Sequence, residues 1–169
     1  MADTPHPVVN ADELDETSYV HGEHFCSYDK QLTPSMQPRG GRLGVNLTRV
    51  PPGRTACPFH YHQLEDEVFY VLSGNGVLRY GDALYPLRPG DCVSCPAGTR
   101  TAHQIANNGS TDLVYLAIGN HEPQEVCGYP DSGKIMVRGL AQVGFFTQAE
   151  YFDGEPAAPK IFALAETLA

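Results

Sequence analysis

Apolar and polar residues alternate in short segments along the middle of the chain, beginning near Leu43. Side chains two apart on a strand share one face of a sheet, so this alternation is typical of half-buried strands. The predicted strands are RLGVNLTRV (42–50), EVFYVLS (67–73), GVLRYG (76–81), ALYPL (83–87), DCVSCP (91–96), HQIANN (103–108) and LVYLAIG (113–119). Turn sequences such as PPG, GNG, RPGD, PAG and NNGS separate them. Strands this short, closed by such turns, predict an all-β antiparallel barrel or sandwich.

The two ends of the chain lack this pattern. Residues 1–42 are polar and are predicted to form an irregular N-terminal arm, with a short helix near Asp12 to Thr17 behind Asn10. Residues 121–169 are predicted to form a loop-rich C-terminal extension that packs on the barrel. Its last ten residues, KIFALAETLA, have helical composition but are too few for a helix that is stable alone. A chain of 169 residues fits one domain with a sizeable core, here residues 43–120.

Composition and charge narrow the class of protein. With 20 acidic against 11 basic residues the net charge is −9, and no cluster of bases occurs, so we expect no nucleic-acid partner and no anionic membrane surface. No apolar run approaches the roughly 20 residues that a membrane helix needs. The first 20 residues lack the basic and apolar regions of a signal peptide. These features predict a cytoplasmic protein.

Five cysteines are scattered along the chain, and Cys92 and Cys95 form a CxxC motif that is typical of redox and zinc sites. The motif falls in a predicted strand, where residues three apart lie roughly 10 Å apart on opposite faces. A disulfide needs Cα atoms within about 7 Å. We therefore expect free thiols that fill apolar strand positions.

The sequence PFHYHQLEDEVFYVLSG, residues 58–74, carries the strongest chemical signal. His60 and His62 are two apart, so on a strand both imidazoles face the same way. Imidazole suits zinc, copper, iron and nickel, and a carboxylate broadens the choice toward manganese. Glu67 can join this face only if the QLED segment forms a turn or bulge that resets the alternation. If it does not, Asp66 is the carboxylate on that face.

A third imidazole, His103, follows a Pro–Ala–Gly turn at the start of another predicted strand. A barrel can bring that strand beside the first hairpin. His21 and His24 have no strand to orient them, and His6 and His121 are expected in exposed loops.

Two separated segments together resemble the cupin superfamily. PGRTACPFHYHQLEDEVFYVLSG resembles its first motif, with matches at Gly53, His60, His62, Glu67 and Gly74. GDCVSCPAGTRTAHQIAN resembles its second motif, with matches at Gly90, Pro96, Gly98, His103 and Asn107, at slightly longer spacings than usual. The segments CPFHYH, LRYGD and YPDSGK are similar to a group of bacterial single-domain cupins of the cupin 2 type, described as sugar-phosphate isomerase-like. The resemblance covers residues 43–120 and extends to YFDGE at 151–155.

The resemblance implies a double-stranded β-helix, or jelly-roll, that holds one divalent metal. The implied ligands are His60, His62, Glu67 and His103, and Glu67 is also the implied catalytic residue. The metal can be iron, manganese, nickel, zinc or copper, since this ligand set does not choose among them. Phe69 and Val71 share the face of Glu67 and are predicted to line the substrate site, and Arg100 is predicted to meet an anionic group of the substrate.

Three classes of function follow from such a site. The first is an isomerase of a sugar or sugar phosphate, in which the metal polarises an oxygen and a base moves a proton. The second is a metal-dependent dioxygenase, oxidase or lyase of a small metabolite, and the third is a non-catalytic module that binds a small ligand. Fold alone does not rank them. The resemblance also predicts a homodimer.

Overall fold

The computed structural model describes residues 6–36 and 40–168, and each of the seven predicted strands is present within two residues of its predicted bounds. They are β3 (Leu43–Val50), β5 (Glu67–Ser73), β6 (Gly76–Tyr80), β7 (Ala83–Leu87), β8 (Cys92–Cys95), β9 (His103–Ala106) and β10 (Leu113–Asn120). Burial alternates along several of them: in β8, Val93 and Cys95 are buried while Cys92 and Ser94 are exposed. The alternation read from the sequence therefore marks the inner face of the barrel.

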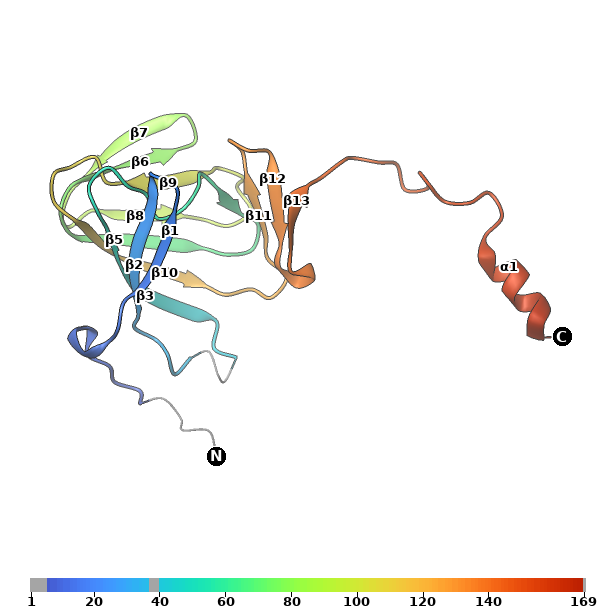
Figure 1. Cartoon of the computed structure of the whole chain (residues 1–169), viewed down its shortest axis with the longest axis horizontal. Helices are drawn as coiled ribbons and strands as arrows, with labels where there is room; N and C mark the ends of the chain where they lie inside the picture. The colour runs from blue at the N-terminus through green and yellow to red at the C-terminus, as the bar shows by residue number, and fades with distance from the viewer. Residues whose placement is uncertain (1–5, 37–39, 169) are drawn as a thin grey trace.

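The strands form antiparallel sheets that close into a jelly-roll barrel (Figure 1). A six-stranded sheet has the order β1-β2-β3-β10-β5-β8, and a three-stranded sheet has the order β7-β6-β9. A third sheet, β13-β12-β11-β4, stands at one end of the barrel. It consists of β4 (Tyr61–His62), β11 (Val126–Tyr129), β12 (Lys134–Val137) and β13 (Gln142–Phe145), with a 3₁₀ turn at Arg138–Leu140 between the last two.

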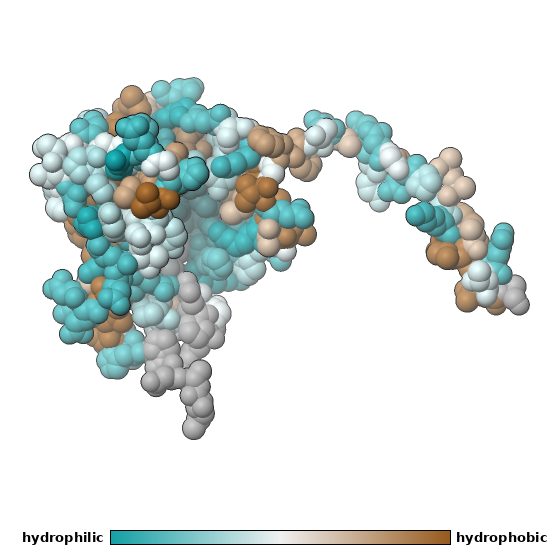
Figure 2. Space-filling model, in the orientation of Figure 1, coloured by the Kyte–Doolittle hydropathy of each residue, from teal (hydrophilic) through white to brown (hydrophobic). Residues whose placement is uncertain are grey.

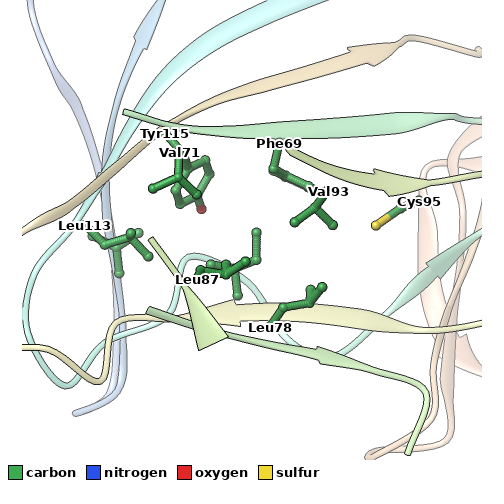
Figure 3. Packing of buried hydrophobic residues seen from close by; sticks show 10 residues of the cluster. Phe69, Val71, Leu78, Leu87, Val93, Cys95, Leu113 and Tyr115 are labelled. Carbon is green, nitrogen blue, oxygen red and sulfur yellow. The ribbon is translucent and has the colours of Figure 1, made fainter. Parts of the chain in front are cut away.

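The apolar core lies between the six-stranded and three-stranded sheets (Figure 3). Phe69 and Val71 on β5 point toward Leu78 and Leu87 on the opposite sheet. On the outer face of β5, Tyr70 and Leu72 are more than 40% exposed. The buried cluster consists of Val50, Phe69, Val71, Leu78, Leu87, Val93, Cys95, Ile105, Leu113 and Tyr115. This packing determines which face of β5 points into the barrel. Glu67, the first residue of β5, lies on that inward face.

One glycine of the first motif has a clear structural reason. Gly74 has φ +79°, a conformation that other residues rarely adopt, and it ends β5. A Cβ at this position would overlap the carbonyl oxygen of Asp112, just before β10. Glycine therefore lets the β5–β6 turn pass close to the neighbouring strand.

The N-terminal arm is more regular than the sequence predicts. Residues 17–31 form a hairpin of β1 (Thr17–His21) and β2 (Phe25–Gln31), and β2 pairs with β3 to extend the six-stranded sheet. Every side chain of β1 is exposed, so no apolar alternation marks it as a strand. The short helix expected behind Asn10 is a 3₁₀ turn at Ala11–Glu13, where the Asn10 side chain accepts a hydrogen bond from the Asp12 amide. The remaining arm includes residues 1–5 and 37–39, which lie outside the described residues.

The C-terminal extension behaves in two ways. Residues 126–145 join the barrel because β11 pairs with β4. From residue 146 onward the chain runs away from the barrel to α1 (Lys160–Ala165) and a final 3₁₀ turn at Glu166–Leu168 (Figures 1 and 2). Its large apolar side chains are exposed, as at Tyr151 and Leu168, each 89% exposed. Within the described part of the chain, no helix has both the length and the apolar character needed to cross a membrane.

Candidate metal centre

Backbone pairing brings the two histidine motifs together at one end of the barrel interior. The His60 amide donates to the carbonyl oxygen of His103 at 3.1 Å, and the His103 amide donates to that of His60 at 2.7 Å. His62 lies two residues further on, at the end of β4. These two ladder bonds hold segments 43 residues apart in one register. The imidazoles of His60 and His103 consequently face each other, with ring centroids 4.6 Å apart.

The QLED segment resets the strand alternation, as Glu67 requires. The Gln63 amide donates to the Val126 carbonyl oxygen, and β5 then starts at Glu67 with that side chain toward the histidines. The alternative carboxylate, Asp66, is exposed and accepts a hydrogen bond from the Ala97 amide at 2.8 Å. Asp66 therefore fixes the neighbouring turn and stays outside the cluster.

Three ring nitrogens converge on one carboxylate oxygen. Glu67 Oε2 lies 2.8 Å from His103 Nε2, 3.2 Å from His62 Nε2 and 3.8 Å from His60 Nε2. In one compact set of donors, His60, Glu67 and His103, all ligand atoms lie within 4.8 Å of one another. Side-chain exposure is 3% for His103, about 10% for His60 and His62, and 25% for Glu67. Glu67 is thus the member of the group most accessible to a small molecule.

Several atoms of this cluster are buried without a hydrogen-bond partner. They are His62 Nδ1, His62 Nε2, Glu67 Oε2 and His103 Nε2. Leaving a buried polar atom unpaired costs about 1–3 kcal/mol, so native proteins rarely do so. Imidazole nitrogens and a carboxylate oxygen arranged around one point are suitable ligands for a divalent transition metal. The residues present therefore fit a metal ion.

Hydrogen bonding orients the His60 ring for such a role. His60 Nδ1 lies 2.8 Å from the carbonyl oxygen of Pro58, which only an N–H at that position can satisfy. The lone pair is then on Nε2, the nitrogen that faces Glu67. Outer hydrogen bonds of this kind fix the tautomer of ligating histidines in metalloproteins.

His62 is backed by two buried acids that the sequence analysis did not single out. Its Nδ1 lies 3.4 Å from Glu65 Oε2 and 3.7 Å from Glu125 Oε1. Glu125 is fully buried and accepts hydrogen bonds from the amides of Gln63 and Leu64 at 2.7 and 3.0 Å. Two acids on the Nδ1 side favour an N–H there, which leaves the lone pair on Nε2 toward Glu67.

An arginine balances the charge of this outer layer. Arg138 binds both carboxylate oxygens of Glu65, with Nη2 2.9 Å from Oε2, and also donates to the Glu122 carbonyl oxygen. The sequence carries one hint of the layer, the run of acids from Glu65 to Glu67. Nothing local distinguishes Glu125 or Arg138, because both lie in the extension beyond the two motifs.

The electrostatic setting of His60 and Glu67 favours the protonation states that bind a metal, whereas that of His62 favours its protonated form when no metal is bound. Burial lowers the pKa of His60 to about 4, so its imidazole is neutral at pH 7. Burial acts to raise the pKa of Glu67, but the close approach and charge of His103 and His62 outweigh it, and the net pKa is lowered. For His62, burial opposes protonation, while Glu67, Glu125 and Glu65 together raise the net pKa. Glu67 is therefore an ionised carboxylate beside imidazoles.

The residues predicted to contact substrate lie in three different settings. Phe69 is buried, with its ring 5.6 Å from that of His103 and 5.8 Å from that of Tyr115. Val71 is 1% exposed within the apolar core. Arg100 is exposed in the loop before His103 and has φ 58°. Their roles in binding substrate stay predictions.

A cavity of about 710 Å³ lies near the His60 ring. Tyr129 links the two, because it lines the cavity and stacks on His60 with ring centroids 6.0 Å apart. Lys134 also lines the cavity, with its Nζ 4.7 Å from the centre of the Tyr129 ring. The other lining residues are Ser18, Tyr19, Val20, His21, Phe25, Ala56, Pro58, Phe59, Gln104, Asp131 and Ser132. Tyr129 and Lys134 are the first and last residues of the YPDSGK segment that carries part of the family resemblance, but no role was predicted for either.

Comparison with known proteins gives consistent results. The cupin domain family model matches residues 46–119. A crystal structure of a “putative sugar phosphate isomerase” from Acidithiobacillus ferrooxidans is similar, with 30% identity, a TM-score of 0.72, and coverage of 82% of this chain and 92% of that one. A sugar phosphate isomerase from a cupin superfamily, from Silicibacter pomeroyi, has 26% identity, a TM-score of 0.69, and coverage of 90% and 97%.

A curated relative is named for a different ligand. The oxalate-binding protein of Thermotoga maritima is 36% identical over 70 residues, which is 41% of this chain and 55% of that protein. The chain thus spans only about half the length of this relative. The family match over the barrel, and the 30% identity over nearly the whole Acidithiobacillus protein, agree with the strand order and with both motifs. The chain belongs to the cupin superfamily.

Proposed function

We propose that this protein is a metal-dependent enzyme that isomerises a small sugar or sugar phosphate. The observation that carries the proposal is the convergence of three Nε2 atoms on Glu67 Oε2, with buried donor atoms that have no other partner. His60, His62, Glu67 and His103 would hold one divalent transition metal. When bound, such a metal supplies Lewis acidity that polarises an oxygen of the substrate.

The residues of the chain supply the remaining functions. Glu67 is the most exposed of the four side chains, so by position it is the one best placed to accept a proton from a substrate carbon or hydroxyl. The neighbouring imidazoles hold that carboxylate in place. Phe69, packed against His103, excludes water from the inner side.

The cavity near His60 supports a polar, anionic substrate. Lys134 offers a positive charge, and Ser132 and Gln104 offer hydrogen-bonding groups on its wall. Two similar proteins are named for action on sugar phosphates, which carry both hydroxyls and an anionic group. We therefore propose that the substrate places its anionic group in this cavity, toward Lys134. Arg100 does not line the cavity and is the alternative contact if the anionic group lies elsewhere.

Elemental analysis tests the metal centre first. Protein purified without added metal should contain about one transition-metal ion per chain, and His62→Ala should lose most of it. His6→Ala, which alters an exposed histidine outside the ligand cluster, serves as the matched control. Equal metal content in wild type and His62→Ala would remove the basis of the proposal.

Turnover tests the reaction. A panel of sugars and sugar phosphates followed by NMR should show isomerisation that chelators abolish and that persists without oxygen. Glu67→Gln should lose turnover more strongly than it loses substrate affinity. Strict oxygen dependence would instead favour a dioxygenase or oxidase, and tight binding without turnover would favour a binding module.

A second candidate, a binding protein or lyase for a small dicarboxylate, is favoured by the 36% identity to the oxalate-binding protein. Calorimetric titration with oxalate and with a sugar phosphate separates the two classes. A homodimer is proposed as well, and light scattering of the full chain measures its mass directly.

A further inference from the structure

A fifth donor stands beside the four proposed ligands. Cys127 on β11 is the partner of His62 on β4 in the antiparallel register. Residues directly opposite each other on such strands project to the same face, with Cβ atoms roughly 4.5–5.5 Å apart. Cys127 is 1% exposed, so its thiol is enclosed on the same side of the sheet as the His62 ring. Neither cupin motif includes this residue.

The distances make the thiol part of a ligand cluster. Donor atoms of His60, His62 and Cys127 all lie within 4.8 Å of one another, the same limit that groups His60 with Glu67 and His103. Both ring nitrogens of His62 are buried without a hydrogen-bond partner. The same is true of Nε2 of His103, whose side chain is only 3% exposed. The cysteine therefore borders a group of orphaned nitrogens.

The other cysteines do not share this position. Cys57 Sγ lies 3.8 Å from His60 Nδ1, the nitrogen already engaged by Pro58. Cys95 belongs to the apolar core, and Cys92 is exposed on the outer face of β8. Cys26 is only partly buried on β2. Within the described residues, Cys127 is the cysteine grouped with two of the proposed histidine ligands.

We propose that Cys127 is a metal ligand, and that with His60 and His62 it gives the centre a preference for thiophilic ions such as zinc, cadmium and cobalt(II). The inference rests on the proposed metal centre and narrows the class of metal that the centre takes. As the metal–sulfur bond forms, the thiol proton passes to solvent and no electron is transferred. Thiolate selects such ions over manganese and magnesium, which oxygen ligands favour.

Cobalt(II) provides a direct spectroscopic test on the full chain. Titration of metal-free protein with cobalt(II) should give a thiolate-to-cobalt charge-transfer band in the near ultraviolet with an end point near one equivalent. Cys127→Ser should lose the band, and Cys127→Ala should lose it too, which guards against effects of a buried hydroxyl. Cys95→Ser and Cys57→Ser, at other enclosed positions, should retain it. Circular dichroism establishes that each variant is folded.

Affinity provides a second readout. Cadmium affinity should fall about tenfold or more in Cys127→Ser, at least the loss that follows removal of an outer partner of a ligand, while manganese affinity should change little. Cobalt bound by wild type without the charge-transfer band, or a band that survives in both Cys127 variants, would overturn the role of Cys127 and leave the His60–His62–Glu67–His103 centre intact. Failure of wild type to bind cobalt any better than His62→Ala would overturn the centre itself.

Discussion

Glu67 and Val71 stand four residues apart on the same face of β5, yet their surroundings are opposite in character. Around Glu67 the facing segments supply His62 and His103, and several polar atoms have no partner. Around Val71 they supply Leu78 and Leu87, and the space is filled by apolar side chains. Four residues of strand span roughly 13 Å. One face of a strand can therefore contribute to a polar site at one end and to the apolar core at the other. The residues on the opposing strands determine which of the two environments forms.

Phe69 forms the boundary between the two ends. Its ring contacts His103 on the polar side and Tyr115 on the apolar side. We infer that the two ends contribute separately, the apolar end to the free energy of unfolding and the polar end to metal binding. The predictions below test that separation, from the largest expected effect to the smallest.

Truncation at the apolar end should cost the most stability. Leu113 is 0% exposed, and Leu113→Ala should lower the free energy of unfolding by about 3 kcal/mol, as cavity-forming changes do. Chemical denaturation measures the loss. Leu84→Ala, at a position that is 68% exposed, should change stability by only about 0.5 kcal/mol. Metal content of the folded Leu113→Ala protein should equal that of wild type, and a loss comparable to His62→Ala would show that the ends are coupled.

Removal of the metal should lower the free energy of unfolding only through the proposed ligands at the polar end of β5. With free metal at about 100 times its dissociation constant, binding adds about 2.7 kcal/mol to the stability of the native state, and a chelator should remove that amount. The increment should persist in Leu113→Ala and vanish in His103→Gln. Thermal melts with metal and with chelator give both values. An unchanged increment in His103→Gln would exclude that residue as a ligand.

The outer acids should tune affinity without being ligands. Glu125→Gln replaces an acceptor oxygen by an amide NH₂ that meets the backbone donors of Gln63 or Leu64 and weakens the orientation of His62. Metal affinity should fall about tenfold, equivalent to about 1.4 kcal/mol. Glu122→Gln, which alters an acid paired with Arg42, should leave affinity unchanged. Competition with a chromogenic chelator measures both, and equal affinities in the two variants would contradict the positioning role.

The smallest effect is expected from alkylation of the two cysteines of β8, which lie on opposite faces of the strand. This test uses the unmodified wild-type protein, so no stability change precedes it. Burial raises the pKa of Cys95 to about 12, so at pH 8 its thiolate population is negligible, whereas Cys92 is exposed. Thiolate is the reactive form, so iodoacetamide should modify Cys92 and spare Cys95. Mass spectrometry of the native protein reads this out. Rapid modification of Cys95, or a Cys92–Cys95 disulfide after oxidation, would contradict the face assignment.

Much of the barrel could be predicted because local sequence and final environment agree. Apolar and polar residues alternate along the strands between Leu43 and Gly119. Turns such as the one at Gly74 have glycine where the backbone has a positive φ. The histidines could be identified because HxH on a strand commits both rings to one side. Glu67 needed the additional knowledge that QLED resets the alternation.

Other features could not be predicted because they depend on contacts far along the chain. The β1 strand is held by its ladder with β2 while its side chains face solvent, so its sequence carries no apolar signal. Glu125 acts on His62 from 63 residues away, and nothing in its own neighbourhood indicates burial. The place of Cys127 beside His62 depends on the register of β11 against β4.

The paired peptide groups of His60 and His103 have a kinetic consequence. These two proposed ligands are already anchored to each other by main-chain hydrogen bonds, so binding of a metal ion would need no folding of the surrounding chain. Uptake and release should then be governed by how fast the ion sheds its water and passes Glu67. Amide exchange at these two positions should be nearly as slow in the empty protein as in the loaded one.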